Sequence, residues 1–204
     1  MILEGLLLTT NGTGQLNLAP MGPIVESSEQ SSTELKRFIL RPFYPSTTLA
    51  NLQAVPQATF HTTDDVLLLA RAALKESLPE PFALPPIMPL DTPATGYRLV
   101  DCCQWWSLGV LSIDAGAQRA TIVMQAGEAG IVRPFAGFQR ARHAVLEAII
   151  LATRTSLLEP AVIWEEIRRW QPLVDKTGGP REREAWELVT SIIEQRLANR
   201  SSSS

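Results

Sequence analysis

The chain has 204 residues, of which 45% are hydrophobic, and its formal charge at pH 7 is −3. This apolar content is sufficient for one core, or for one core with a small helical annex. The slightly acidic balance argues against nucleic-acid binding by bulk charge, and no apolar run reaches the roughly 18 residues of a membrane helix. We therefore expect neither a nucleic acid nor a membrane as a partner.

Residues 1–22 predict a β-hairpin, because an apolar run at 1–10 and an alternating run at 15–22 flank a turn rich in Asn and Gly. Pro20 has no N–H to donate, so strand pairing should stop there or the strand should become an edge. Gly22 lacks a side chain, which allows the backbone to approach something flat. A planar ligand would suit this strand end, although many ordinary strands end in the same way.

Residues 35–40 are typical of a strand, and a loop stiffened by two prolines follows at 41–48. Ser46 or Thr47 is a suitable N-cap for a short helix through Leu52. The free N–H groups of that helix, the hydroxyls of its first turn and Arg41 are together the parts of a phosphate site. The alternative is that the hydroxyl only caps the helix and Arg41 is solvated.

The middle of the chain predicts a strand at 55–61, and then a buried helix capped by Asp64 or Asp65. Residues 78–93 contain six prolines and predict a long excursion without regular structure, which is functional or wraps a partner. Residues 97–113 and 120–124 predict a second long hairpin around a turn at 114–116.

Two tryptophans and two cysteines lie near the start of this second hairpin. In a strand, Trp105 and Trp106 should point to opposite faces, one inward and one able to stack on a flat ligand. Cys102 and Cys103 should also point apart. Because these are the only cysteines and are adjacent, they cannot form a disulfide framework, which favours a cytoplasmic location.

The last third of the chain changes to helical periodicity, with helices expected at 140–156, 161–170 and 180–198. Pro160 suits a first turn, and Pro172 should end or kink its helix. Strands followed by helices predict an α+β protein.

The first turn of the helix at 140–156 carries Arg140, Arg142 and His143. Cations are unfavourable at a helix N-terminus, so this cluster requires an anionic partner. That partner is either a phosphate or carboxylate ligand, or a protein group such as Glu147. His143 and His61 are the only histidines and lack a metal-ligand spacing, so no metal is expected.

Together these segments resemble a known fold. Residues 17–22 (Asn-Leu-Ala-Pro-Met-Gly), 41–43 (Arg-Pro-Phe) and 47–52 (Thr-Thr-Leu-Ala-Asn-Leu) are similar to the FMN-binding split barrel of the flavin reductase-like group. With residues 140–148 and 151–154, they most resemble an uncharacterised prokaryotic family of that fold, over nearly the whole chain. The bulky, stiff segment at 44–46 departs from the family pattern.

The resemblance implies a homodimer that holds one FMN per subunit near the subunit interface. It implies that the isoalloxazine ring lies along Pro20, Met21 and Gly22. It further implies that the phosphate and ribityl chain are held by Arg41, Thr47, Thr48 and Asn51, and it extends the ligand contacts to Arg140 and His143.

The expected architecture is therefore an α+β fold, with a split β-barrel carrying one inserted helix at 1–133 and a helical extension at 134–199. Residues 200–204 should form a disordered tail. The expected activity is FMN-dependent transfer of hydride or electrons from a reduced nicotinamide to a small heterocycle of the flavin or pterin type. The alternatives are a non-enzymatic flavin carrier or sensor, and an interaction module that has lost its cofactor.

Overall fold

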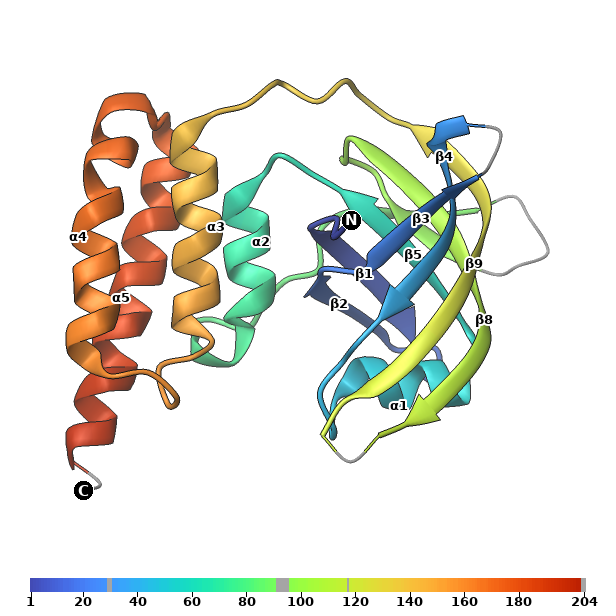
Figure 1. The fold of residues 1–204 in the computed structure, drawn as a ribbon, viewed down its shortest axis with the longest axis horizontal. Coiled ribbons are helices and arrows are strands. Elements are labelled where there is room, and N and C mark those ends of the chain that lie inside the picture. The colour runs from blue at the N-terminus through green and yellow to red at the C-terminus, as the bar shows by residue number, and fades with distance from the viewer. Residues whose placement is uncertain (29–30, 91–95, 117, 203–204) are drawn as a thin grey trace. The chain divides into compact units, whose positions relative to one another are not determined.

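A computed structural model describes residues 1–28, 31–90, 96–116 and 118–202 (Figure 1). The chain divides into two compact units. The barrel unit comprises residues 1–63 and 84–135, and the helical unit comprises residues 64–83 and 136 onward. No helix among the described residues is both long and apolar enough to cross a membrane.

The barrel unit contains a seven-stranded sheet whose described pairings are all antiparallel, in the order β2-β1-β5-β8-β9-β4-β3. The predicted first and second hairpins are present as β1–β2 and β8–β9. The strands are β1 (Gly5–Thr10), β2 (Leu16–Met21), β3 (Ile24–Ser28), β4 (Ser31–Leu40), β5 (Gln57–Thr62), β8 (Gln104–Ala115) and β9 (Ala120–Ile131).

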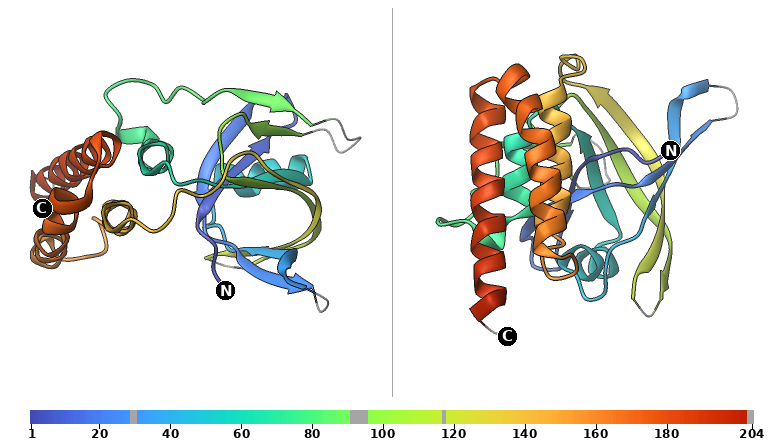
Figure 2. Two further views of the ribbon diagram at one scale, coloured as in Figure 1. Left: turned by 90° about the horizontal axis from the view of Figure 1, so that it is seen from above. Right: turned by 60° about the vertical axis from the view of Figure 1, so that its left-hand side comes forward.

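The residues that precede β1 pair with the edge strand β3. Leu3 N donates to Pro23 O over 3.1 Å, and Val25 N donates to Met1 O over 2.8 Å. Residues 1–3 thus pair with the start of β3, while β1 itself lies beside β2. The strands curl around a common interior, as the view from above shows (Figure 2). Pairing continues past Pro20 to Met21, and β2 is an edge strand.

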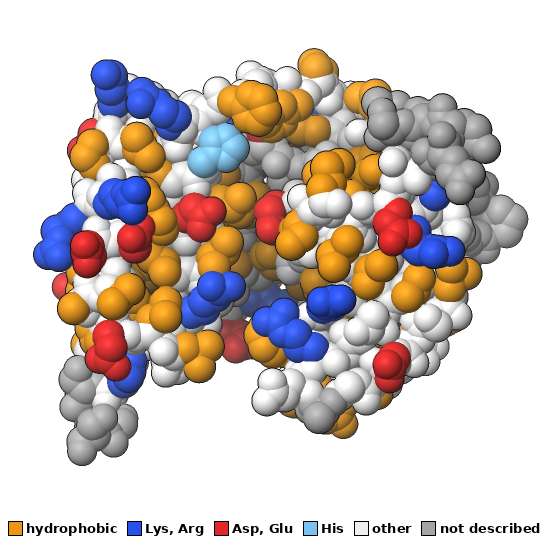
Figure 3. Space-filling view, in the orientation of Figure 1, with side chains coloured by type: hydrophobic (Ala, Val, Ile, Leu, Met, Phe, Trp, Pro, Cys, Tyr) orange, Lys and Arg blue, Asp and Glu red, His pale blue; other side chains and the backbone are white. Residues whose placement is uncertain are grey.

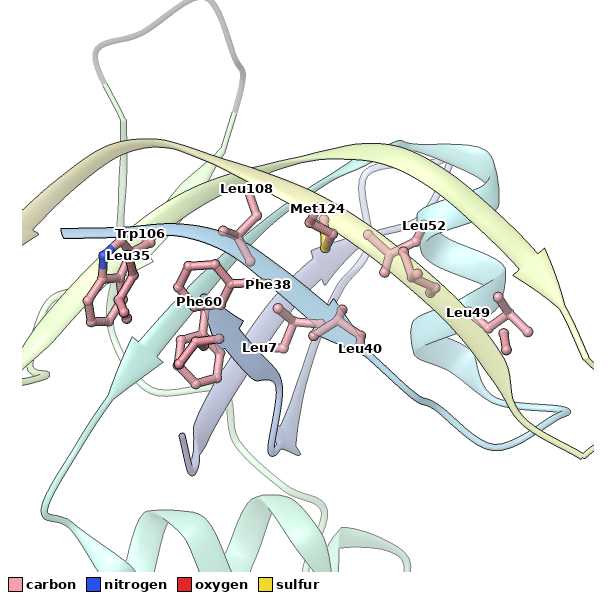
Figure 4. Close-up of a cluster of buried hydrophobic side chains, with 13 residues drawn as sticks. Leu7, Leu35, Phe38, Leu40, Leu49, Leu52, Phe60, Trp106, Leu108 and Met124 are labelled. Carbon is pink, nitrogen blue, oxygen red and sulfur yellow. The ribbon is translucent and has the colours of Figure 1, made fainter. Parts of the chain in front are cut away.

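The barrel core is built from large side chains that alternate along the strands. Phe38 lies with its ring centroid 5.6 Å from that of Phe60 and 5.7 Å from that of Trp106. Helix α1 (Thr47–Ala54) contributes Leu49 and Leu52 to the same core (Figure 4). Burial of these side chains fixes the position of α1, and therefore of its N-terminus, against the barrel.

The two tryptophans differ in environment, as strand alternation predicts, but both are buried. Trp106 is part of the barrel core, whereas Trp105 has the Arg98 guanidinium 5.8 Å from its ring centroid. The predicted run at 97–113 is interrupted, because one strand ends at Leu99 and β8 begins at Gln104. Cys102 and Cys103 lie in this interruption, so strand alternation does not separate them, and both are free and buried.

The expectation that residues 78–93 hold no regular structure is wrong at 87–89. There β6 (Ile87–Pro89) pairs with β7 (Tyr97–Leu99). The prolines are tolerated because their carbonyls still accept hydrogen bonds, as Pro86 O does from Val100 N over 2.9 Å, and because Pro89 ends its strand. Residues 91–93 of the excursion lie outside the described residues.

Within the described residues, the helical unit contains the 3₁₀ helix η1 (Lys75–Ser77) and four α-helices. These are α2 (Val66–Ala73), α3 (Arg140–Ala152), α4 (Pro160–Thr177) and α5 (Pro180–Ser202). Helix α3 packs against α2, α4 and α5. Asp65 caps α2 through hydrogen bonds from the N–H groups of Leu67 and Leu68.

Three boundaries differ from the sequence-based expectations. Helix α2 groups with the later helices instead of forming an insert of a domain at 1–133, because its apolar side chains find their partners there. Helix α4 continues through Pro172 to Thr177. Helix α5 extends to Ser202, so residues 200–202 are helical rather than a disordered tail, and residues 203–204 lie outside the described part.

On the face drawn in Figure 3, acidic and basic side chains are interspersed over the helices and do not gather into a patch of one sign. This distribution agrees with the small net charge of −3.

Candidate functional site

The N-terminus of α1 is held by a side-chain cap. Ser46 Oγ accepts a hydrogen bond from Leu49 N over 3.3 Å, and Ser46 O accepts one from Ala50 N over 3.1 Å. The N–H groups of Thr47 and Thr48 have no acceptor within the helix at these positions. This end of α1 therefore presents backbone donors beside the loop that carries Arg41.

A hollow of about 530 Å³ lies beside this helix end, which we call the strand-end hollow. Its size is within the range of ligand pockets, about 300–1,000 Å³. It is lined by Ile2, Ala19, Pro20, Met21, Gly22, Ile24, Ile39, Arg41, Pro42, Phe43, Ser46, Thr48 and Arg119. Five residues proposed from the sequence thus meet in one place: Pro20, Met21, Gly22, Arg41 and Thr48.

Gly22 lies close to side chains from the first residues of the chain. A Cβ atom at this position would lie 3.0 Å from Glu4 Oε1 and 3.1 Å from Ile2 Cγ2. The missing side chain therefore leaves room for the start of the chain, which supplies Ile2 to the hollow.

The charges in the strand-end hollow have one sign. Its lining residues include Arg41 and Arg119, and none of the described ones is Asp or Glu. Within the described residues, the Arg41 side chain makes no hydrogen bond or ion pair. Arg119 places its guanidinium carbon 3.9 Å from the centroid of the Phe43 ring. Two lining cations, with no Asp or Glu among the described lining residues, adjoin the N–H groups at the start of α1, and together they form a site receptive to an anion.

Two residues that were predicted from the same segment do not line the hollow. Thr47 is exposed at the first position of α1. Asn51 is buried, and its Nδ2 donates to Oγ1 of Thr9 over 3.0 Å. The segment 47–52 therefore divides its polar residues between the hollow, the solvent and the barrel interior.

Arg140 and His143 belong to the helical unit, where both are exposed on α3. The His143 ring stacks on that of Phe138, with centroids 6.0 Å apart. The lining of the strand-end hollow includes neither residue.

The basic cluster in the first turn of α3 was expected to have an anionic partner. For Arg142, this partner is a pair of protein carboxylates. Its Nε donates to Glu182 Oε1 over 2.9 Å, and its Nη1 donates to Asp64 Oδ2 over 3.2 Å. Burial alone would raise the pKa of Glu182, but the Arg142 guanidinium and the Gly179 N–H lower the pKa overall. Two carboxylates on other segments, not Glu147, thus neutralise Arg142.

His61 is completely buried and has a structural environment. Leu99 N donates to its Nε2 over 3.1 Å, so Nε2 is unprotonated and Nδ1 carries the proton toward Leu6 O at 3.3 Å. Burial lowers the pKa of His61 to about 4. Burial also raises the pKa of the Cys102 thiol to about 11. Neither group is suited to proton transfer or nucleophilic attack at neutral pH. Among the described residues, no cluster of three or more His, Cys, Asp or Glu could hold a metal.

Arg119 and Phe43 are functional candidates that sequence reasoning missed. The second hairpin was predicted, but its pairing with the loop after β4 was not. The isolated bridge between Phe43 and Arg119 joins residues 76 positions apart, and no local pattern reports such a contact. The sequence showed only that Arg119 lies beside a hairpin turn. Because arginines are common at such positions, this does not indicate a binding role.

The antiparallel sheet that closes on itself, with α1 packed into its core, defines the class of this protein. It is an α+β protein with the split-barrel fold of the flavin reductase-like group, followed by a helical extension. The chain belongs to the family described as "Protein of unknown function (DUF447)", whose N-terminal domain matches residues 4–133 and whose second part matches residues 139–191.

Solved structures show the same fold. An FMN-bound protein of this family from Methanosarcina mazei has a TM-score of 0.76 at 22% identity, with 94% of each chain covered. An FMN-binding protein from Thermus thermophilus with bound p-hydroxybenzaldehyde has a TM-score of 0.51 at 10% identity, covering 63% of this chain and 71% of that chain. A flavin reductase domain protein from Arthrobacter sp. has a TM-score of 0.50 at 18% identity, covering 66% and 79%.

Proposed function

We propose that this protein binds FMN in the strand-end hollow and acts as an FMN-dependent oxidoreductase. The single observation that carries the proposal is the composition of the hollow, in which two arginines and a helix N-terminus adjoin an apolar strand end without a lining carboxylate among the described residues. This combination provides one anionic subsite and one flat apolar subsite, and FMN consists of a phosphate and a planar ring.

The donor set fits the phosphate of this cofactor. The Arg41 guanidinium can form charge-assisted hydrogen bonds to phosphate oxygens, and the N–H groups of the first turn of α1 that lack helical acceptors add neutral donors. Thr48 is 5% exposed and lines the hollow, so its hydroxyl can add a further donor to the phosphate. The edge strand end at Pro20–Gly22 would lie along the ring, as the family resemblance implies.

The cofactor, when bound, supplies the hydride and electron chemistry. The chain's own part is to bind the phosphate, orient the ring and keep one ring face accessible. The titratable groups among the described lining residues are the two arginines, so this chain offers no proton donor in the hollow. Hydride transfer through a flavin does not require one from the protein.

Several finer features belong to the same proposal. The M. mazei protein is FMN-bound and the T. thermophilus protein is FMN-binding, which supports FMN as the ligand. We infer a reduced nicotinamide as the electron donor and a small heterocycle of the flavin or pterin type as the acceptor. We also infer a homodimer with FMN near the subunit interface. Two free cysteines and a nicotinamide donor favour the cytoplasm.

The test has two stages. First, FMN is titrated into purified apoprotein and followed by flavin fluorescence and calorimetry, and saturable binding at a ratio of one per chain is expected. Second, NADH or NADPH is added to the complex without oxygen, and loss of flavin absorbance is expected. Binding without reduction by either nucleotide would favour the flavin carrier or sensor, and a lack of binding would leave the interaction module.

A further inference from the structure

Arg119 is the feature of the strand-end hollow that neither the sequence nor the family resemblance indicated. It lies just before β9, far along the chain from the phosphate segment, and its guanidinium packs on the Phe43 ring at 3.9 Å. Both side chains line the hollow. An arginine stacked on an aromatic ring keeps its edge N–H groups free to donate in the ring plane.

The backbone fixes this pair from both sides. Tyr44 N donates to Gln118 O over 3.0 Å, and Ala120 N donates to Pro42 O over 3.1 Å. The residues between them, Phe43 and Arg119, form an antiparallel bridge. The position of Arg119 relative to the hollow is therefore set by main-chain pairing, and the stacked ring restricts its side chain further.

The nearby turn contributes to the same constraint. A Cβ atom at Gly116 would lie 2.5 Å from Arg119 O, so only glycine allows the turn to bring this carbonyl so close. The backbone that carries Arg119 is thus constrained by the turn as well as by the bridge.

The charges match a phosphate monoester. Such a group carries about −1.5 to −2 charges near neutral pH. One cation, Arg41, neutralises only part of that charge, whereas Arg41 and Arg119 together balance it. Arg119 has no ion pair with a carboxylate among the described residues, so its charge is not already compensated.

The geometry points to Arg119 as a specificity residue that selects the phosphate-bearing flavin FMN over riboflavin, with Phe43 as its positioning residue. This inference rests on the proposed function. Riboflavin has the same ring and ribityl chain but no phosphate, so contacts along Pro20–Gly22 contribute equally to both ligands. Arg119 therefore acts on the difference in affinity between FMN and riboflavin.

The experiment measures the dissociation constants of FMN and riboflavin for the full chain and four variants. The wild-type protein should bind FMN at least about 10-fold more tightly than riboflavin. Arg119→Ala should reduce that preference by about 10-fold or more, as expected for a hydrogen-bonded charge. Arg119→Lys should retain part of it, because the charge remains while the planar fork and its stacking are lost. Phe43→Leu should reduce it less than Arg119→Ala.

Arg37→Ala is the matched control. Arg37 is an exposed arginine of the same unit that pairs with Glu26 at 3.7 Å and does not line the hollow. Its removal changes the net charge equally and should leave the preference within about twofold. Raising the salt concentration should weaken FMN binding less in Arg119→Ala than in Arg37→Ala, because one phosphate contact is already missing.

The outcomes distinguish a failure of the proposed flavin binding from a failure of the role assigned to Arg119. If the wild-type protein binds neither flavin, the proposed function fails. If it binds both flavins equally, or if Arg119→Ala retains the full preference while remaining folded by circular dichroism, flavin binding stands and the role of Arg119 is wrong. If Arg119→Ala loses the preference but Phe43→Leu keeps it in full, Phe43 has no positioning role.

Discussion

Asn51 of α1 donates a hydrogen bond from Nδ2 to Oγ1 of Thr9 on β1 over 3.0 Å, and both side chains are more than nine-tenths buried. Thr9 Oγ1 donates in turn to Asn17 O on β2 over 3.4 Å. This chain of bonds ties the helix to the first hairpin. Asn51 therefore has a structural role that competes with the cofactor contact that the family resemblance implied.

The first prediction concerns this bond. Asn51→Ala should lower the free energy of unfolding by about 1–3 kcal/mol, because it removes a buried bond and leaves the Thr9 hydroxyl without its donor. Urea unfolding measures this change. FMN affinity of the folded variant should stay within about twofold of wild type. A variant of unchanged stability with strongly reduced FMN affinity would instead establish Asn51 as a ligand.

The second prediction concerns the phosphate contacts. Arg41→Ala and Thr48→Val should each weaken FMN binding by about 1–3 kcal/mol, because each removes a hydrogen bond to a charged group. Valine preserves the shape of the buried threonine. Calorimetric titration of FMN measures both effects.

Thr47→Val is the matched control, since it makes the same change one residue earlier, at an exposed position outside the hollow. It should bind FMN as wild type does. Riboflavin should bind all three variants with about the wild-type affinity. FMN affinity that is unaffected in both Arg41→Ala and Thr48→Val would refute the phosphate assignment.

Local sequence was sufficient for the part of this site that lies between the end of β4 and α1. The turn at 11–14 and the cap at Ser46 specify their own geometry, so the β1–β2 hairpin and α1 could be predicted. Arg41 and Thr48 are separated by one stiff loop, and they do line one hollow. Pro20–Gly22 reaches the same place only through the sheet, and here the family resemblance added what spacing could not provide.

The features that sequence reasoning missed depend on long-range packing. Helix α2 is apolar on almost all sides, which predicts burial but not the partners that bury it. The β6–β7 pairing depends on the register between residues 87–89 and 97–99, which local composition does not encode. The many prolines around β6 favoured irregular structure instead. Arg119 joins the hollow through a bridge to Phe43 that no local pattern encodes.

The third prediction concerns Arg142. Arg142→Ala should destabilise the helical unit by about 3 kcal/mol at pH 7, because two largely buried carboxylates, Asp64 and Glu182, lose their shared cation. Since the pKa of folded Glu182 is lowered, its contribution is present above its ordinary pKa and disappears as pH falls through the native value. Thermal unfolding followed by far-UV circular dichroism should therefore show a smaller loss in acid.

Arg140→Ala provides the comparison for this effect. Arg140 is exposed in the same turn of α3 and has no ion pair within the described residues. Its removal should change stability by less than about 0.5 kcal/mol. Equal losses in both variants would mean that general charge, and not the pairing with Asp64 and Glu182, determines the stability.

The fourth prediction concerns the pH dependence set by His61. Burial lowers its pKa to about 4 from an ordinary value of 6.5, against the raising effect of its bond to Leu6 O, and the nearby Arg98 charge adds to the lowering. The unfolded chain therefore binds a proton between these two values that the folded chain does not. Stability is fully present above the higher value and falls as pH decreases toward the lower one.

The expected loss from this residue is about 2 kcal/mol between pH 7 and pH 5. The structural reason is that a protonated Nε2 cannot accept the hydrogen bond from Leu99 N, which joins β7 to β5. His61→Asn removes the titrating group, so its unfolding free energy should be lower at pH 7 but should change less between the two pH values. His143→Asn removes an exposed histidine and should keep the wild-type slope. If His61→Asn retains that slope as well, other groups cause the acid sensitivity, and the buried neutral His61 is not its origin.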